Sequence, residues 1–228
     1  MSVERWQAHG NVYLVNDEPG LTPDRVRAEV GDADGIVEVI AHGPDWADIV
    51  IWNPDGSTAE MSGNATRIAA AWVGADAVRI SVAGHEVKSR RLANGEIEQE
   101  LDGVEVFARE TVAGLDVIPV SVGNPHAVVI GDPDDLPTIG PLLETHERFP
   151  NRTNVQVARI DGPGRVTARV WERGVGETSA SGTSAIAVAA ATHGEGEVIV
   201  SFPGGDLTVR LEGSRAWLTG PAERDVER

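Results

Sequence analysis

The sequence contains no cysteine. That absence excludes disulfide bridges, metal sites built from thiolates, and any thiol nucleophile in this chain. Thiol chemistry of every kind is therefore closed to this protein.

Positive charge is also scarce. Asp and Glu number 36 against 19 Lys and Arg, the formal net charge is −17, and Lys88 is the only lysine. Long-range repulsion opposes binding to nucleic acid or to anionic membranes, so we expect no nucleic-acid partner. A small anionic substrate would need a local positive site. The excess of Asp, Glu and Arg fits a salt-adapted or GC-rich source.

Long apolar runs are missing too. No segment approaches the ~20 apolar residues that cross a bilayer. The opening stretch MSVERWQAHG lacks the apolar centre of a signal peptide. We therefore expect a cytoplasmic protein with no membrane partner. Apolar residues still make up 41% of the chain, which favours a folded globular protein.

What the sequence does contain is a succession of short β-like runs, among them NVYLV, GIVEVI, HAVVIG and RVTARVWE. Two segments, 63–73 and 182–191, run in Ala, Ile and Val without a breaker and predict buried helices. Residues 23–29 predict a third, amphipathic helix. The 228 residues suffice for one large domain or for two of about 110 residues.

A weak internal repeat favours two similar halves. Ser62-Gly63 recurs as Ser181-Gly182, and Gly10-Asn11 recurs as Gly123-Asn124, each after close to half the chain length. Two such matches are weak evidence alone, but the matched helices add to them. We predict three parts: an N-terminal half at 1–112, a C-terminal half at 113–218, and a tail at 219–228 that returns to the first half.

A glycine-containing turn leads into each of the two buried helices. Backbone N–H groups at a helix start lack intrahelical partners and lie at the positive end of the dipole, so such a turn is a potential anion site. The simpler alternative is that each serine only caps its helix. Polar residues and glycines around the turns favour the anion site, because a simple cap needs none of them: Asp55, Gly56, Ser57, Glu60, Gly174, Gly176, Glu177, Thr178 and Ser179.

Four motifs closely resemble those of the diaminopimelate epimerase family: NPDGSTAEMSGNATR, VGNPHAVVI, ERGVGETSASGTSA and PGGDL. The resemblance spans nearly the whole chain. It implies an α+β fold of two pseudo-twofold-related domains, each a curled, mostly antiparallel sheet around a central helix. It further implies a homodimeric isomerase that interconverts LL- and meso-diaminopimelate for lysine and cell-wall precursors, without cofactor or metal.

The catalytic positions depart from the family pattern. Family members place one cysteine at the start of each central helix, as base and acid for a proton on the α-carbon; here those positions are Ser62 and Ser181. An aliphatic hydroxyl has a pKa about five units above the ~8.5 of a thiol, so forming the base costs about 7 kcal/mol more. We therefore expect very slow epimerisation or none. Three interpretations stay open: an engineered double Cys→Ser variant, a natural homologue whose chemistry is lost or changed, and serines activated by their neighbours.

The resemblance also assigns the remaining site residues. His126 and Glu172 match residues that assist proton transfer. Amides, a guanidinium and backbone donors match positions that bind the substrate: Asn11, Asn53, Gly63, Asn64, Asn124, Asn154, Arg173, Gly182 and Thr183. Taken singly, each polar side chain has a structural alternative as a turn asparagine, a core histidine or a surface ion pair. Their joint match to one motif set favours the site.

Two departures loosen the assignment of the substrate within the family. Val12 stands where the family usually has Asp, and Gly35 stands where a Gln is often found. The chain is also shorter than is usual in the family. A different amino acid or diamino acid therefore stays possible as the substrate.

Other classes of function fit less well. A phosphate-binding loop of the GxxxxGK[ST] type is absent, and the six histidines are scattered without a paired metal motif. The serious alternatives are a non-catalytic amino-acid-binding homologue and a racemase of another amino acid.

Overall fold

The computed structural model of the chain describes residues 3–225. It divides into two compact units, one formed by residues 3–100 with 219–225 and the other by residues 101–218. The bounds that the sequence suggests for the halves, 1–112 and 113–218, stay a prediction.

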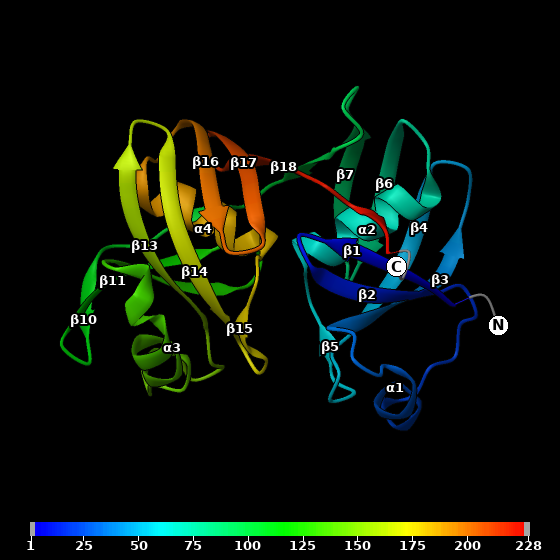
Figure 1. Cartoon of the computed structure of the whole chain (residues 1–228), viewed down its shortest axis with the longest axis horizontal. Helices are drawn as coiled ribbons and strands as arrows, with labels where there is room; N and C mark the ends of the chain where they lie inside the picture. The colour runs from blue at the N-terminus through cyan, green and yellow to red at the C-terminus, as the bar shows by residue number, and fades with distance from the viewer. Residues whose placement is uncertain (1–2, 226–228) are drawn as a thin grey trace. The chain divides into compact units, whose positions relative to one another are not determined.

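The first unit is a mostly antiparallel sheet with two helices (Figure 1). Its elements in chain order are β1 (Val3–Ala8), β2 (Asn11–Asn16), α1 (Pro23–Glu29), β3 (Gly35–His42), β4 (Trp46–Trp52), β5 (Thr58–Ala59), α2 (Gly63–Val73), β6 (Ala77–Val82), β7 (His85–Arg91), β8 (Ile97–Leu101) and β19 (Glu223–Arg224). Two pairs of neighbouring strands are parallel, β2 with β3 and β4 with β6. The short strand β19 pairs with β1, so the described part of the C-terminal tail joins the first unit.

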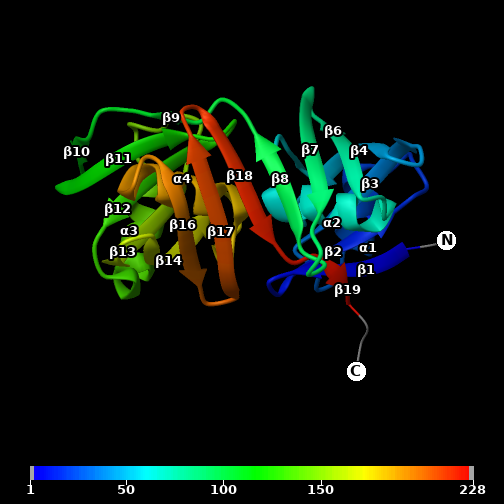
Figure 2. The same cartoon turned by 90° about the horizontal axis from the view of Figure 1, so that it is seen from above.

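The second unit repeats this order (Figure 2). Its elements are β9 (Glu105–Val106), β10 (Glu110–Val112), β11 (Leu115–Ser121), β12 (Pro125–Ile130), the 3-10 turn η1 (Pro133–Asp135), α3 (Leu136–Glu144), β13 (Asn154–Gly162), β14 (Arg165–Glu172), β15 (Gly176–Thr178), α4 (Gly182–Thr192), β16 (Gly196–Phe202), β17 (Gly205–Glu212) and β18 (Arg215–Gly220). Its parallel pairs, β12 with β13 and β14 with β16, stand at the same places as those of the first unit.

From β11 to β18, the second unit therefore matches the first unit from β1 to β8, element by element. A hairpin, an outer helix, a second hairpin with a short strand, a central helix and three further strands follow one another in both. The predicted α+β class with mostly antiparallel sheets and few helices is confirmed.

The central helices α2 and α4 form the cores of their units. Small apolar side chains on all sides let strands approach closely, and α4 is buried from Gly182 to Ala190. α2 packs among strand residues such as Val37, Ile49 and Ile80. It ends at Gly74, whose φ of 83° is the left-handed conformation that glycine adopts without strain. The helices expected at 63–73, 182–191 and 23–29 are confirmed, the second extending one residue further.

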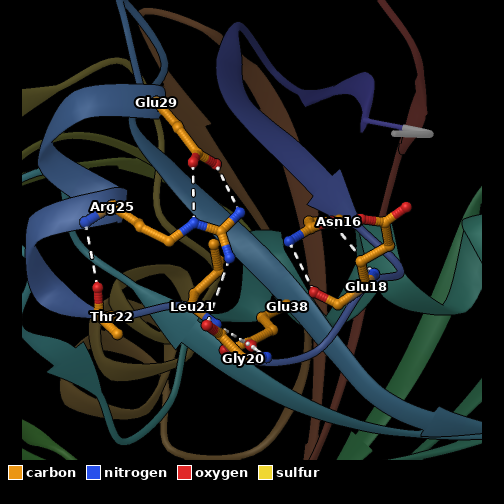
Figure 3. Close-up of polar contacts among 8 residues, drawn as sticks. All are labelled: Asn16, Glu18, Gly20, Leu21, Thr22, Arg25, Glu29 and Glu38. Atoms are coloured by element: carbon orange, nitrogen blue, oxygen red, sulfur yellow. Dashed lines mark hydrogen bonds and ion pairs between the residues drawn. The ribbon is translucent and has the colours of Figure 1, made fainter.

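The outer helix α1 is held by a buried carboxylate. Glu38 of β3 accepts hydrogen bonds from the backbone N–H groups of Gly20 at 2.6 Å and Leu21 at 2.8 Å (Figure 3). It also accepts one from Trp52 Nε1 at 2.7 Å. Because a carboxylate bond to backbone N–H is charge-assisted, Glu38 fixes the segment that leads into α1.

The sequence pattern does not predict the outer helix α3. Pro137 and Pro141 disfavour a helix over these residues, although a proline in the first turn is tolerated. Gly140 is there for close packing, because a Cβ at this position would lie 2.8 Å from Trp171 Cβ. Tertiary contact with β14 therefore outweighs the local propensity.

Candidate active site at two helix starts

Ser62 is positioned at the start of α2 by extended backbone. Its φ is −146°, and its hydroxyl accepts a hydrogen bond from the Ala65 N–H at 3.3 Å. Thr66 Oγ1 donates to the Ser62 carbonyl at 2.9 Å. The Tyr13 hydroxyl oxygen of β2 lies 3.4 Å from Ser62 Oγ. Ser62 therefore caps its helix and also contacts a phenol.

A buried guanidinium orients the amides beside this helix start. Arg67 Nη2 donates to Asn64 Oδ1 at 2.7 Å, and Asn64 Nδ2 donates to Asn11 Oδ1 at 3.2 Å. Arg67 is 0% exposed, and its Nη1 has no hydrogen-bond partner within residues 3–225. Burial lowers the pKa of Arg67 to about 10, which still leaves it charged at neutral pH. The first unit thus keeps a positive charge behind its helix start.

Asn53 lies in a tight turn of its own. Its Nδ2 donates to Ser57 Oγ at 2.9 Å, and its backbone N–H donates to the Ser57 carbonyl at 2.8 Å. Asp55 Oδ1 accepts from the Ser57 N–H at 2.8 Å. Among the described residues, the hydrogen bonds of Asn53 stay within this turn and do not join it to Asn11 or Asn64.

Ser181 starts α4 differently. It is 4% exposed with extended backbone, and it makes no side-chain cap hydrogen bond within the described chain. Gly182 and Thr183 follow it as the first buried residues of the helix. Thr183 Oγ1 accepts from Asn124 Nδ2 at 3.4 Å, which links the end of the β11–β12 turn to the helix start.

A histidine holds Asn124 in place. His126 Nε2 lies 2.8 Å from Asn124 Oδ1, and Gln156 Nε2 lies 3.0 Å from His126 Nδ1. Since the Gln156 amide nitrogen only donates, Nδ1 accepts and Nε2 carries the proton that Asn124 receives. Burial, together with the nearby charge of Arg173, lowers the pKa of His126 to about 3. At neutral pH His126 is therefore an uncharged donor to Asn124.

Asn154 and Glu172 brace the loop that carries Arg173. Asn154 Nδ2 donates to the Pro125 carbonyl at 3.0 Å, and its Oδ1 accepts from the Arg173 N–H at 2.9 Å. Glu172 Oε1 accepts from Thr178 Oγ1 at 2.6 Å. The Arg173 guanidinium also donates to the carbonyl of residue 151 at 3.4 Å. Asn154 thus joins β12 to this loop through both atoms of its amide.

A second buried carboxylate supports the same loop. Glu144, at the end of α3, accepts from the Gly174 N–H at 2.6 Å and from Trp171 Nε1 at 2.9 Å. Arg152 forms an ion pair with it at 2.5 Å. No sequence motif points to Glu144, because the helix that carries it is not predicted.

Of the residues predicted from the sequence, the structure joins Asn11 with Asn64 in the first unit. In the second unit it joins Asn124 with His126 and Thr183, and Asn154 with Arg173. The sequence patterns do not indicate three neighbours of these residues: Tyr13, Arg67 and Gln156. The one usable signal was that Tyr13 and His126 each follow a Gly-Asn pair by the same spacing.

Between residues 3 and 225, no group of three or more His, Asp and Glu side chains is arranged to hold a metal ion. Within the same residues, no helix has both the length and the apolar character needed to cross a membrane.

The chain is similar in sequence to bacterial diaminopimelate epimerases. The family model for diaminopimelate epimerase matches residues 118–224. The diaminopimelate epimerase of Synechococcus sp. is 33% identical over 97% of this chain and 95% of its own length. That of Pelotomaculum thermopropionicum is 37% identical over 91% of this chain and 87% of its own.

Solved structures share the fold at low identity. A phenazine biosynthesis protein of the PhzF family from Bacillus anthracis aligns with a TM-score of 0.74 at 16% identity, over 98% of this chain and 96% of that one. A hydroxyproline epimerase from Agrobacterium vitis aligns with a TM-score of 0.72 at 15% identity, over 98% and 90%. These likenesses show the fold alone.

Proposed function

This chain belongs to the diaminopimelate epimerase family, and from that membership we propose that it binds LL- and meso-diaminopimelate with Ser62 and Ser181 at the two proton-transfer positions. No cofactor or metal takes part in this proposal. The partner is a small diamino dicarboxylic acid in the cytoplasm, and the homodimer expected from the family resemblance stays a prediction.

The observation that carries the proposal is the duplicated helix start. A serine in extended backbone precedes a buried glycine at the first position of α2 and again of α4. Side-chain amides stand beside both starts, Asn64 with Asn11 in one unit and Asn124 in the other. A helix start flanked by neutral donors suits a carboxylate, because the dipole and the N–H groups favour negative charge there.

The proposed roles follow from the side chains. The backbone of Gly63 and Asn64, and of Gly182 and Thr183, would bind the reacting α-carboxylate. Arg173 would pair with a carboxylate, and Asn11, Asn53 and Asn124 would bind the ends of the substrate. His126 and Asn154 are bonded within the second unit, so we assign to them the placement of Asn124 and of the Arg173 loop. Glu172, held by Thr178, is the proposed assistant in proton transfer.

The chemistry that the two serines support is slow. Inversion at the α-carbon needs a base on one face and an acid on the other. A hydroxyl is a far weaker acid than a thiol, so its ionised form, which would act as the base, is far less populated. We therefore propose that turnover of this serine form is very slow or absent.

A non-catalytic amino-acid-binding protein is the second candidate, and the absence of any cysteine is the observation that favours it. A racemase of another amino acid is the third, favoured by Val12 and Gly35 at positions where the family differs.

Calorimetric titration tests the binding step. We expect both LL- and meso-diaminopimelate to bind, and Arg173→Ala to weaken binding by about 1.5 to 3 kcal/mol, because a charge-assisted pair is lost. Arg165→Ala is the matched control: Arg165 is exposed at the opposite end of β14, so its loss should leave binding unchanged. Folded protein that takes up neither isomer would contradict the proposal.

A further inference from the structure

The start of α2 holds a titratable group that the family chemistry does not use. Tyr13 is the only tyrosine of the chain, and its hydroxyl lies 3.4 Å from Ser62 Oγ. The side chain is 8% exposed and packs in the core of the first unit. The Tyr13 phenol therefore lies beside Ser62, which stands at the position where family members have cysteine.

A glycine makes room for this ring. Gly35 stands beside Tyr13 in the parallel pairing of β2 and β3. A Cβ at position 35 would lie 2.7 Å from Tyr13 Cε1 and 2.5 Å from the Trp52 carbonyl oxygen, so no other residue fits without displacing them. The glycine at the position where the family often has glutamine is therefore coupled to the tyrosine.

Tyr13 in the first unit and His126 in the second hold equivalent positions in the repeat of the fold. Tyr13 follows Gly10-Asn11 and pairs with the first residue of β3, and His126 follows Gly123-Asn124 and pairs with the first residue of β13. Both rings thus occupy the same site of the repeated unit. His126 is bonded to Asn124 and Gln156, whereas Tyr13 contacts the helix-start serine itself.

We propose that Tyr13 is a proton-relay residue that accepts, through Ser62, the α-proton of a substrate bound as described under the proposed function. As the C–H bond breaks, the proton passes to Ser62 Oγ while the Ser62 hydroxyl proton passes to the Tyr13 phenolate. The carbanion keeps the electron pair, and the reverse step returns a solvent-derived proton. Tyr13 acts through Ser62 and does not touch the substrate.

A phenol is suited to this step where an aliphatic hydroxyl is not. The ordinary pKa of a phenol is ~10, on the order of three units below that of an aliphatic hydroxyl, so a phenol gives up its proton far more readily than serine alone. The positive end of α2 and the Ala65 N–H on Ser62 Oγ both favour negative charge at the pair. The charged and titratable side chains on the elements around it are Glu4, Arg5, Glu38, His42, Asp48 and Arg67, with His9, Asp34 and Glu60 in the adjoining turns. Of these, the buried cation Arg67 favours the phenolate, and the carboxylates oppose it.

Proton NMR in deuterated water tests the relay. The unmodified protein should wash out the α-hydrogen of one diaminopimelate isomer, at a rate that rises with pH. Because Tyr13 is the sole tyrosine, the ultraviolet absorbance of phenolate reports its ionisation directly, and the two pH profiles should coincide. Tyr13→Phe should lower the washout rate by about 10² to 10⁴-fold while leaving calorimetric binding within about twofold. Ser62→Ala should lower the rate similarly and leave the phenolate titration in place.

The outcomes separate this inference from the proposed function. If Tyr13→Phe binds and exchanges like the unmodified protein, the relay is wrong. If the unmodified protein binds an isomer but never exchanges its α-hydrogen, the relay is also wrong, while the proposed binding stands. If folded protein binds neither isomer, the proposed function itself fails and the relay fails with it.

Discussion

At the scale of the residue, His126 shows how burial decides chemistry. The imidazole is 1% exposed and bonded at both nitrogens, and burial lowers its pKa to about 3. A group this reluctant to take up a proton is a poor general base at neutral pH. Its contribution is to present a fixed N–H to Asn124.

The low pKa of His126 predicts acid sensitivity. The folded pKa lies below the ordinary 6.5, so between about pH 6.5 and about pH 3 the unfolded chain binds a proton that the folded chain refuses. Stability contributed by this site is therefore present above pH 6.5 and falls with decreasing pH, by roughly 1.4 kcal/mol per pH unit.

Urea unfolding of the unmodified protein and of His126→Gln, from pH 7 to about pH 4.5, measures this effect. Glutamine does not titrate, so the free-energy difference between the two proteins should shift in favour of the variant as the pH falls. The other histidines and the carboxylates are common to both proteins and cancel. A difference that stays constant over this range would show that His126 takes up its proton equally in both states.

At the scale of the element, the turn at residues 173–175 between β14 and β15 is held in place by side chains from other elements. Glu144 accepts the Gly174 N–H and the Trp171 indole, and Asn154 accepts the Arg173 N–H. Both supporting residues are buried and belong to other elements. The loop geometry is therefore set by α3 and β13.

Glu144→Gln should loosen this loop. The glutamine NH₂ group is a donor, and it would face one of the two N–H groups that the Glu144 carboxylate now accepts. The ion pair with Arg152 would also be lost. We expect the free energy of unfolding to fall by about 1 to 3 kcal/mol and diaminopimelate binding to weaken about tenfold. Glu147→Gln, on an exposed residue three positions further, is the control for charge. Lower stability with unchanged ligand affinity would contradict the link between Glu144 and the Arg173 loop.

The same elements show what the sequence can and cannot predict. α2 is read correctly because its alanine run, serine cap and Gly74 act within the helix. α3 is missed because Gly140 and Pro141 argue against a helix, and the reason for the glycine is Trp171, 31 positions further along the sequence. A sequence pattern reports interactions between neighbouring residues, whereas this helix is stabilised by contacts between distant parts of the chain.

At the scale of the whole molecule, the repeat is the main organising fact. The sequence hints at it through Ser-Gly and Gly-Asn pairs, and the strand pairings show it in full. Motifs also point to the residues at both helix starts. They do not reveal Tyr13, Arg67 or Gln156 as neighbours, because those contacts depend on register between strands and on burial.

The net charge of the whole chain contrasts with the positive charges placed near the two helix starts. The chain carries −17 overall, yet Arg67 is buried behind one helix start and Arg173 follows the strand that leads to the other. Diaminopimelate carries two carboxylates and two ammonium groups, so its net charge is near zero at neutral pH and the charge of the whole chain has little net effect on it. Under the proposed function, its carboxylates are held by these few cations and helix starts. Binding should therefore depend on named residues and not on the general field.

We propose that Ser62 and Ser181 occupy the acid and base positions of an epimerase that works with two proton carriers. Replacing both by cysteine is the direct measurement, because each thiol would then sit at a helix start that lowers its pKa. The two single variants and the serine parent are the controls, since a single thiol leaves a serine, a far weaker acid, at the opposite position.

Proton NMR of the α-hydrogen with LL- and meso-diaminopimelate, in deuterated water, follows inversion and exchange together. We expect the Ser62→Cys, Ser181→Cys double variant to invert the α-carbon. We expect little inversion by the single variants, with faster exchange of opposite isomers. A double variant that binds ligand yet shows neither exchange nor inversion would contradict the proposed roles of Ser62 and Ser181 and leave the chain as an amino-acid-binding protein.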